Sequence, residues 1–193
     1  MDITFGGDAA KTFVTNVGLI TSTGPHGPNV MAAEWTHHIS YSPGLVAICP
    51  SPKSATAENI RVTREFGVSI ASSSQKTLAS LAGNYTGKEV QKVEALKELG
   101  FSFREGKVIK APMVDGSSLI IECTVKEWLE PGDHLLIIGE AVHVEPHPEH
   151  APLVYHQGKY WSLGESLVKT PKEERDRMAK VVESFKKRVN LGC

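Results

Sequence analysis

The sequence has little cysteine and no surplus of charge of one sign. Its three cysteines, Cys49, Cys123 and Cys193, are odd in number and far apart, which argues against a disulfide framework and against a CxxC metal or redox pair. Cys49 and Cys123 lie in apolar strand-like segments, where a small core residue is a commoner role than a catalytic thiol. Lysine and arginine number 21 against 22 acidic residues, so no global field draws the chain to nucleic acid or anionic lipid.

Long hydrophobic runs are also missing. The longest apolar stretches, such as residues 134–139, have the length of a strand and fall short of the roughly 20 residues that a membrane helix needs. The first residues show no basic segment followed by a hydrophobic one, so we expect no secretory signal and a cytoplasmic protein. Neither GxGxxG nor GxxxxGK[ST] occurs, so the standard dinucleotide and nucleotide-triphosphate loops are excluded.

The sequence does contain a succession of short strand-like segments. Residues 13–20 and 29–33 flank a turn rich in Gly and Pro and predict a hairpin. The alternation in residues 119–126 predicts a half-exposed strand with Glu122 on its polar side, paired with residues 134–145. Two further strands are predicted at residues 45–49 and 66–71. Because the strands show no regular βαβ alternation, they favour a mainly β domain, an antiparallel Greek-key barrel.

Short helices are predicted between these strands and after them. Residues 54–64, 75–81 and 89–99 have helical character, with Gly100 at the C-cap of the last. We therefore expect a barrel domain over residues 1–160 and an extension over residues 161–193. Residues 170–173 predict a capping box that opens an amphipathic helix in this extension, with an apolar stripe of Met178, Val181, Val182, Phe185 and Val189. The stripe could pack on its own barrel or on a second subunit.

The segment from residue 29 to residue 59 is the most informative about chemistry. Residues 29–36 combine small residues, which a flat ligand can approach, with polar groups that can bond ring heteroatoms. Three hydroxyl residues and one lysine then gather at a helix start, and an asparagine follows one turn later: Ser51, Lys53, Ser54, Thr56 and Asn59. Unpaired amides and the dipole make such a terminus an anion site, although Ser and Thr also open helices merely to cap them. Both interpretations are open at this point.

A histidine-rich segment gives a weaker indication of metal binding. His143, His147 and His150 are close in sequence, but Pro146 and Pro148 prevent the helix that would align them. We therefore expect no metal site. The charged runs of the tail mix both signs and are typical of solvated helix faces.

The order of four segments resembles the flavin reductase-like FMN-binding split barrels, and within them the flavoredoxin-type branch. The resemblance covers residues 13–160. The four segments are residues 29–36 with Ser40 and Pro43; residues 54–60; residues 87–92, which are similar to Gly-Arg-Asp-x-Asp-Lys; and residues 132–134 followed by 139–142. Gly44 replaces a second proline of the family, and lysine replaces arginine at residues 53 and 88, which removes bidentate phosphate contacts but keeps the charge.

The resemblance implies a split barrel that binds FMN, and it assigns the site residue by residue. The flavin ring would lie along Asn29, Ala33, Glu34, Trp35 and Thr36. The phosphate would be held by Ser51, Lys53, Ser54, Thr56 and Asn59, with Lys88 near the phosphate or the ring edge. His134, the catalytic candidate, would lie near the open face of the ring. At the place that the resemblance gives it, His134 could orient a nicotinamide or stabilise reduced flavin. It could also simply bond its neighbours at a strand start.

The function implied is that of a flavin reductase-like oxidoreductase. It would move hydride or electrons between NAD(P)H, or a redox partner, and bound flavin. We also expect a homodimer with the flavin near the subunit interface, as in the family. The alternative is a non-catalytic FMN-binding or carrier protein, and a pyridoxamine-phosphate-oxidase-like activity is less favoured because the segments match the flavin reductases better.

Overall fold

The computed structural model describes residues 2–186 of the chain. The chain divides between Leu163 and Gly164 into two compact units. The larger unit holds the strands and the helices that flank them, and the smaller unit holds one helix near the C-terminus. The two units are described separately.

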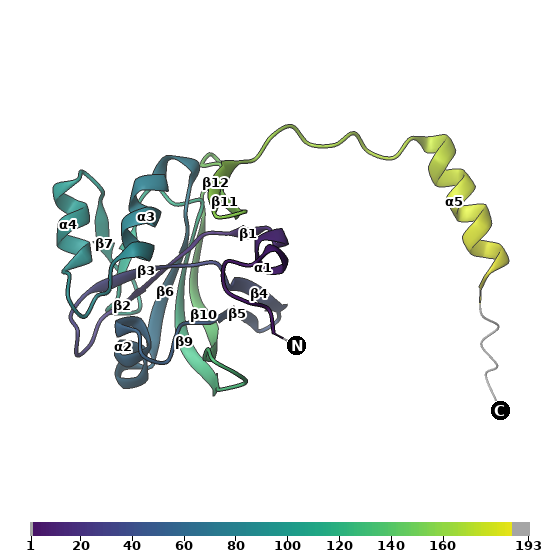
Figure 1. Ribbon diagram of the computed structural model, residues 1–193. Coiled ribbons are helices and arrows are strands. Elements are labelled where there is room, and N and C mark those ends of the chain that lie inside the picture. The colour runs from purple at the N-terminus through teal and green to yellow at the C-terminus, as the bar shows by residue number, and fades with distance from the viewer. Residues whose placement is uncertain (1, 187–193) are drawn as a thin grey trace, which may run out of the picture. The chain divides into compact units, whose positions relative to one another are not determined.

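A curled antiparallel sheet forms the larger unit (Figure 1). Its strand order is β3-β2-β6-β9-β10-β5-β4, and every neighbouring pair is antiparallel. Only Glu34 and Trp35 separate β3 from β4, although these strands lie at opposite ends of the order, so the curl must bring the two edges close together. The seven strands are β2 (Gly18–Ser22), β3 (Asn29–Ala33), β4 (Thr36–Tyr41), β5 (Gly44–Ile48), β6 (Glu65–Ile70), β9 (Leu119–Leu129) and β10 (Leu136–Pro146).

Two small sheets and short helices complete the larger unit. The small sheets contain β1 (Thr15–Asn16), β11 (Leu153–His156) and β12 (Lys159–Ser162), and β7 (Phe103–Glu105) with β8 (Pro112–Val114). The helices are α1 (Asp8–Thr12), α2 (Ala55–Thr63), the 3-10 turn η1 (Ser73–Gln75), α3 (Lys76–Asn84) and α4 (Lys92–Glu98). Helices α2, α3 and α4 all contact β3, so they cover one edge of the main sheet.

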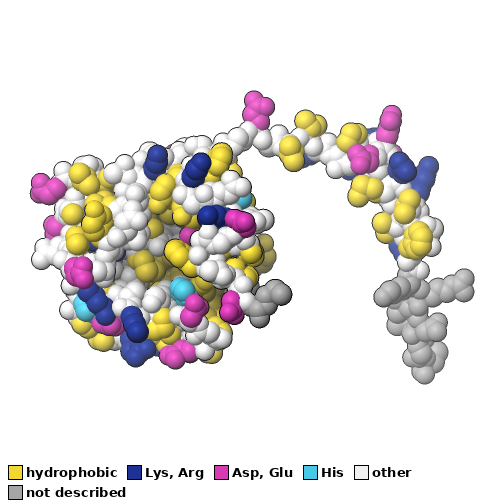
Figure 2. Space-filling model, in the orientation of Figure 1, with side chains coloured by type: hydrophobic (Ala, Val, Ile, Leu, Met, Phe, Trp, Pro, Cys, Tyr) yellow, Lys and Arg dark blue, Asp and Glu magenta, His cyan; other side chains and the backbone are white. Residues whose placement is uncertain are grey.

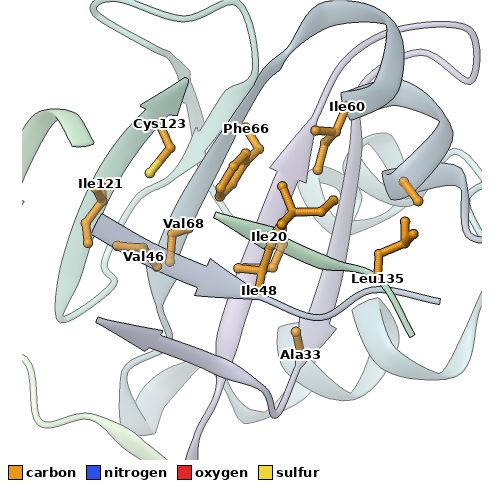
Figure 3. Close-up of a cluster of buried hydrophobic side chains, with 12 residues drawn as sticks. Ile20, Ala33, Val46, Ile48, Ile60, Phe66, Val68, Ile121, Cys123 and Leu135 are labelled. Carbon is orange, nitrogen blue, oxygen red and sulfur yellow. The ribbon is translucent and has the colours of Figure 1, made fainter. Parts of the chain in front are cut away.

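Three hydrophobic clusters fill the unit, and the two largest position the elements around the site. The first lies inside the curl of the sheet and joins it to α2 through Ile60 (Figure 3). Phe66, Ile20 and Ile48 in this cluster are fully buried. The second cluster packs α3 and α4 against β2 and β3 through residues such as Leu78 and Leu96. Burial of these side chains is the main stabilising contribution, and it also fixes the helices beside the edge strand.

The predicted strands and helices are present, with several shifted boundaries. Residues 13–20 divide between β1 and β2, β10 begins at Leu136 rather than at residue 134, and α3 continues to Asn84. Helix α4 begins at Lys92 rather than at residue 89, because residues 86–90 form a turn in which the Val90 amide donates to the Thr86 carbonyl at 3.0 Å. The helix ends at Glu98 with Leu99 as its C-cap, one residue before the predicted Gly100, which follows with a φ of +86°. The Phe101 amide donates to the Leu96 carbonyl at 3.0 Å, the bond of a Schellman motif.

The prediction that Glu122 lies on an exposed face was wrong. Its side chain is fully buried, and its carboxylate accepts the backbone amides of Lys107, Val108 and Ile109 at 2.7–2.9 Å. The loop of residues 106–109 folds over this part of β9 and replaces solvent with three donors. Burial raises the pKa of Glu122, but these hydrogen bonds outweigh it and hold the pKa below its ordinary value.

The smaller unit contains helix α5 (Lys172–Ser184). Pro171 occupies the N-cap position and no side chain caps the helix, so the predicted capping box is not formed. Met178, Val181, Val182 and Phe185 are all exposed, and hydrophobic and charged side chains lie side by side along the helix (Figure 2). Val189 and Cys193 lie outside the described residues. No helix within residues 2–186 is both long and apolar enough to cross a membrane.

We predict that Glu122→Gln destabilises the protein by about 2 kcal/mol at pH 7, because a carboxamide leaves part of the buried donor set unpaired. A carboxyl whose pKa falls on folding stabilises the protein above its unfolded-state pKa, and this contribution is lost as the pH falls through the folded-state pKa. The wild type should therefore lose more stability than the variant below about pH 4. Urea unfolding across this pH range measures both effects. Glu127→Gln, at an exposed position of the same strand, is the control. If both variants lower the free energy of unfolding by the same amount, the prediction is contradicted.

Candidate functional site

A cavity of about 300 Å³ opens where α2 and the edge strand β3 meet the end of α3. It is lined by residues from three parts of the chain: Asn29 and Met31; Ser54, Ala55 and Thr56; and Ala82, Gly83, Asn84, Tyr85, Thr86, Gly87 and Lys92. Three of the residues predicted for the site, Asn29, Ser54 and Thr56, therefore line one cavity. The first turn of α2 forms part of the wall, and amides of a first helical turn lack partners within the helix.

A buried hydrogen bond fixes the floor of the cavity. The Asn29 Nδ2 donates to the Thr56 Oγ1 at 2.9 Å, and the two side chains are 2% and 1% exposed. The Asn29 Oδ1 is buried and has no hydrogen-bond partner among the described residues. A Cβ on Gly87 would lie 2.3 Å from this oxygen, so only glycine allows the loop to approach so closely. Buried polar atoms are normally paired, so this orphan acceptor indicates a place for a ligand or a water.

The start of α2 is capped by its own residues. The Ser54 Oγ accepts the Ala57 amide at 3.1 Å and donates to the Ser51 carbonyl at 2.8 Å, so Ser54 acts as the N-cap. Lys53 is exposed and does not line the cavity. Ser54 therefore has the capping role that the sequence analysis left open. The start of α2 also lines the cavity.

Asn59 and Lys88 lie outside the cavity. The buried Asn59 amide donates to Ser22 and to the Gly27 carbonyl and accepts the His26 amide, so it holds the turn between β2 and β3. The Lys88 Nζ pairs with a Glu58 oxygen at 2.5 Å, and the His26 Nε2 lies 2.6 Å from the other Glu58 oxygen. The hydrogen bond from Lys88, and then that from His26, holds the pKa of Glu58 below its ordinary value.

Lys92 is the residue that the sequence analysis missed. It is 2% exposed, lines the cavity, and donates from Nζ to the Ala82 carbonyl at 3.0 Å. Burial lowers its pKa to about 8. Lys92 is the last residue of the segment 87–92 that carries part of the resemblance, although the resemblance places the role near the phosphate on Lys88.

His134 and Trp35 form a second group of candidates. Their rings meet edge to face with centroids 4.8 Å apart, and the Trp35 side chain is 47% exposed. The His134 Nδ1 lies 2.9 Å from the Asp133 Oδ1, and this hydrogen bond lowers the pKa of Asp133. The Leu135 amide donates to the Pro50 carbonyl at 3.0 Å, which links the loop before β10 to the loop before α2. His134 thus bonds its neighbour and is also placed against an exposed aromatic ring.

The other predicted ring contacts differ in exposure. Ala33 and Thr36 are buried, whereas Glu34 between them is exposed, and partial burial raises its pKa. The Asn16 Nδ2 donates to the Thr36 carbonyl at 3.1 Å, which ties the start of β4 to β1. Residues 33–36 thus form the short connection from edge strand β3 to edge strand β4.

The two described cysteines lack the features of catalytic thiols. Burial, followed by the charge of Glu122, raises the pKa of Cys123 to about 12, and burial also raises the pKa of Cys49. Both changes disfavour the thiolate, which is the nucleophilic form.

The histidine-rich segment forms an ion-pair cluster around Glu145. Glu145 contacts Arg104, Lys107 and His143. The hydrogen bonds from Lys107 and then from His143 lower the pKa of Glu145 to about 2. Within residues 2–186, no group of three or more His, Cys, Asp or Glu side chains is placed to hold a metal ion.

Comparison with known proteins identifies the family. The flavin reductase like domain matches residues 10–164, which is most of the chain. This chain belongs to the flavin reductase-like family. The reductase subunit HsaB of a flavin-dependent monooxygenase from Mycobacterium tuberculosis is 28% identical over 166 residues, which span 85% of this chain and 83% of HsaB.

Solved structures agree with the family assignment. Flavin reductase PheA2 superposes with a TM-score of 0.71 at 27% identity, covering 86% of this chain and 100% of PheA2. The NADH:FAD oxidoreductase SgcE6 of Streptomyces globisporus C-1027 superposes with a TM-score of 0.74 at 22% identity, covering 81% and 90% of the two chains, and shares the fold. The predicted split barrel and the flavin reductase-like function are therefore confirmed.

We predict that Gly87→Ala lowers the flavin affinity of this flavin reductase-like protein about tenfold, because the added methyl group meets the Asn29 Oδ1 and enters the cavity. Gly83→Ala is the matched control, since it lines the same cavity but its Cβ meets only the Ala32 Cβ at an ordinary 3.5 Å. Fluorescence titration with flavin measures both affinities. If the two variants bind equally well, Gly87 does not define the floor of the site.

Proposed function

We propose that this protein binds FMN and reduces it with NAD(P)H, and that the reduced flavin or its electrons pass to a separate acceptor protein. The observation that carries the proposal is the cavity at the first turn of α2, which is built on the Asn29–Thr56 hydrogen bond in a chain of the flavin reductase-like family. Bound flavin supplies the redox chemistry, since its ring accepts hydride and releases electrons singly or in pairs.

The residues present suit the phosphate and sugar-alcohol end of FMN. The first turn of α2, with Ser54 and Thr56, offers amides and hydroxyls to a phosphate, while the unpaired Asn29 Oδ1 can accept from a ligand hydroxyl. Ser51, Lys53, Asn59 and Lys88 are proposed to act from outside the cavity. Lys53 and Lys88 would contribute charge at its rim, and Asn59 would hold the turn of residues 23–28 against α2.

The flavin ring is proposed to lie outside the cavity, along the crossing from β3 to β4. Small-molecule pockets usually measure about 300–1,000 Å³, so this cavity is at the lower limit of that range and would hold only part of FMN. Ala33, Glu34 and Thr36 would face the ring largely through backbone groups. Trp35 and His134 would then border its open face, where His134, oriented by Asp133, would position the nicotinamide.

A homodimer and an oxygenase or other redox partner complete the proposal. Edge strand β4 exposes Ile39 at 49% and Tyr41 at 91%, beside Trp35, which supports a subunit contact near the ring. The relative HsaB is named as the reductase subunit of a monooxygenase, which supports a partner of that kind. We also propose a cytoplasmic location, which the free thiols of Cys49 and Cys123 support.

The proposed function is tested by the absorbance spectrum of the purified protein between about 300 and 550 nm, before and after FMN is added and removed by desalting. Retained flavin bands that bleach under anaerobic conditions with NADH or NADPH are the expected result. Bands that persist with both nucleotides would indicate an FMN carrier instead of a reductase. A protein that stays colourless after FMN is added would refute retention of FMN, and fluorescence titration then decides whether FMN binds weakly as a substrate.

We predict that His134→Ala slows flavin reduction by NAD(P)H about a hundredfold while the protein keeps its flavin, because the imidazole positions the nicotinamide and not the cofactor. Stopped-flow absorbance measures the reduction rate, and desalting measures retention. Asp133→Asn, which keeps the ring but weakens its orientation, should give a smaller loss. Release of flavin by His134→Ala would instead make His134 a binding residue.

A further inference from the structure

We propose that Arg61 and Arg64 bind the 2′-phosphate of NADPH, so that this protein prefers NADPH to NADH as its electron donor. The inference rests on the proposed function, since it names the form of the nicotinamide nucleotide that the same site takes. Arg61 lies in the last turn of α2, and Arg64 is the C-cap residue of that helix. Both side chains are exposed, and Lys and Arg side chains gather over α2 at the lower left of the view in Figure 2.

The two arginines converge on one aromatic ring. The guanidinium carbon of Arg61 lies 5.3 Å from the centroid of the Trp128 ring, and that of Arg64 lies 6.0 Å from it. Trp128 is only partly buried, but it packs against the hydrophobic cluster inside the curl, which fixes its position. A cation over an aromatic face is held without hydrogen bonds, so this contact uses none of the N–H donors of either group. Trp128 thus aligns two guanidinium groups at one place.

Neither arginine has an ion-pair partner among residues 2–186. The acidic residues nearest to them in sequence bond elsewhere. Glu58 pairs with Lys88 and His26. The Glu65 carboxylate accepts the Lys110 amide at 2.7 Å. Two like charges at one ring repel each other, and a bound dianion would offset this repulsion, since a phosphate monoester carries close to two charges at pH 7.

The backbone at Arg64 argues against a purely structural role for its side chain. Arg64 has a φ of 59°, in the left-handed region that favours glycine. The contacts that end the helix come from the main chain: the Arg64 amide donates to the Ile60 carbonyl, and the Arg64 carbonyl accepts the Val125 amide, both at 2.8 Å. Glycine would keep both bonds without the steric cost of a Cβ. A positive charge suits a helix C-terminus, but Arg61 in the last turn already supplies one.

The arginine pair lies within reach of a nucleotide whose nicotinamide meets His134. Trp128 is opposite Ile137 in the pair of strands β9 and β10, and Ile137 is three residues beyond His134, about 10 Å at strand spacing. The intervening loop is held to the segment before α2 by the hydrogen bond from Leu135 to Pro50. A dinucleotide carries its nicotinamide at one end and its adenosine at the other, so it can span this distance. The 2′-phosphate on that adenosine is the group that distinguishes NADPH from NADH.

The arrangement suits a terminal phosphate better than the pyrophosphate bridge, which both nucleotides share. The two charges of a phosphate monoester lie on the oxygens of one phosphorus atom, whereas a pyrophosphate diester spreads its two charges over two linked groups. Two guanidinium groups gathered at one ring match the compact dianion, and each can offer paired N–H donors to two of its oxygens. An arginine also accommodates the 2′-phosphate of NADP in unrelated dinucleotide sites.

The test measures kcat/KM for NADPH and for NADH, with FMN as the flavin. We expect Arg61→Gln and Arg64→Gly each to lower the ratio of NADPH to NADH about tenfold, while NADH, which lacks the phosphate, should lose less than about twofold. Arg64→Gly should also keep or raise the stability to urea, so its effect cannot come from misfolding. Lys126→Gln is the matched control and should keep the ratio, because it removes one charge from the strand that carries Trp128, where Lys126 is paired with Glu140.

The wild-type protein distinguishes failure of this inference from failure of the proposed function. If neither NADPH nor NADH reduces the flavin, both are refuted. If NADH is used as well as NADPH or better, the reductase stands and the role of the arginine pair is refuted. Equal losses for the two nucleotides in the variants would place the pair at the shared pyrophosphate and overturn the assignment to the 2′-phosphate. A preference for NADPH that is lost in both arginine variants and kept in Lys126→Gln supports both.

A binding measurement tests the same contact without turnover. Adenosine 2′,5′-bisphosphate carries the phosphate in question and AMP lacks it, so calorimetry with these two probes isolates its contribution. The wild type should bind the bisphosphate at least about tenfold more tightly than AMP, and the Arg61→Gln/Arg64→Gly double variant should bind both alike. The difference should shrink in the wild type as salt is raised, because both guanidinium groups are exposed to solvent. Equal affinities for the two probes in the wild type would overturn the proposal.

Discussion

The hydrogen bond between Asn29 and Thr56 joins the two elements on which the site depends. Asn29 begins the edge strand β3, and Thr56 lies in the first turn of α2. An edge strand has one side without a strand partner, and here the helices cover it. The bond fixes the helix terminus beside that edge, and the glycine at residue 87 lets the next loop close over the same point. The cavity is the space that remains among these three elements.

Two buried charges in this fold illustrate how structural and binding roles differ. The Glu122 carboxylate receives three backbone amides, so its desolvation is offset within the protein and it holds a loop in place. Lys92 is about as buried but donates to only one carbonyl found among the described residues. A charge that the protein fully compensates stabilises the fold, whereas one left largely uncompensated beside a cavity is available to a ligand. The same reasoning sets Lys88, already paired with Glu58, apart from Lys92.

The sequence predicted the local features well because their causes are local. Alternating apolar residues marked the strands, Ser54 marked the start of α2, and Gly100 marked the end of α4 through its left-handed conformation. Burial of polar groups was not predictable in this way. Glu122 is buried by a loop about fourteen residues away, and Asn59 bonds a turn more than thirty residues earlier. Alternation assigns such residues to a face, but only the tertiary fold decides whether water reaches that face.

The division of the site between a small cavity and an open face bears on how a flavin reductase could work. If the cavity holds the phosphate end, affinity comes from charge and helix amides, while the ring stays on the side of Trp35 and His134. A ring so placed can be reached by a nicotinamide, and it can also be exchanged, because little of it needs to be enclosed. Deep burial of the ring would favour retention over exchange. The strength of the phosphate contact would then set how long flavin remains bound.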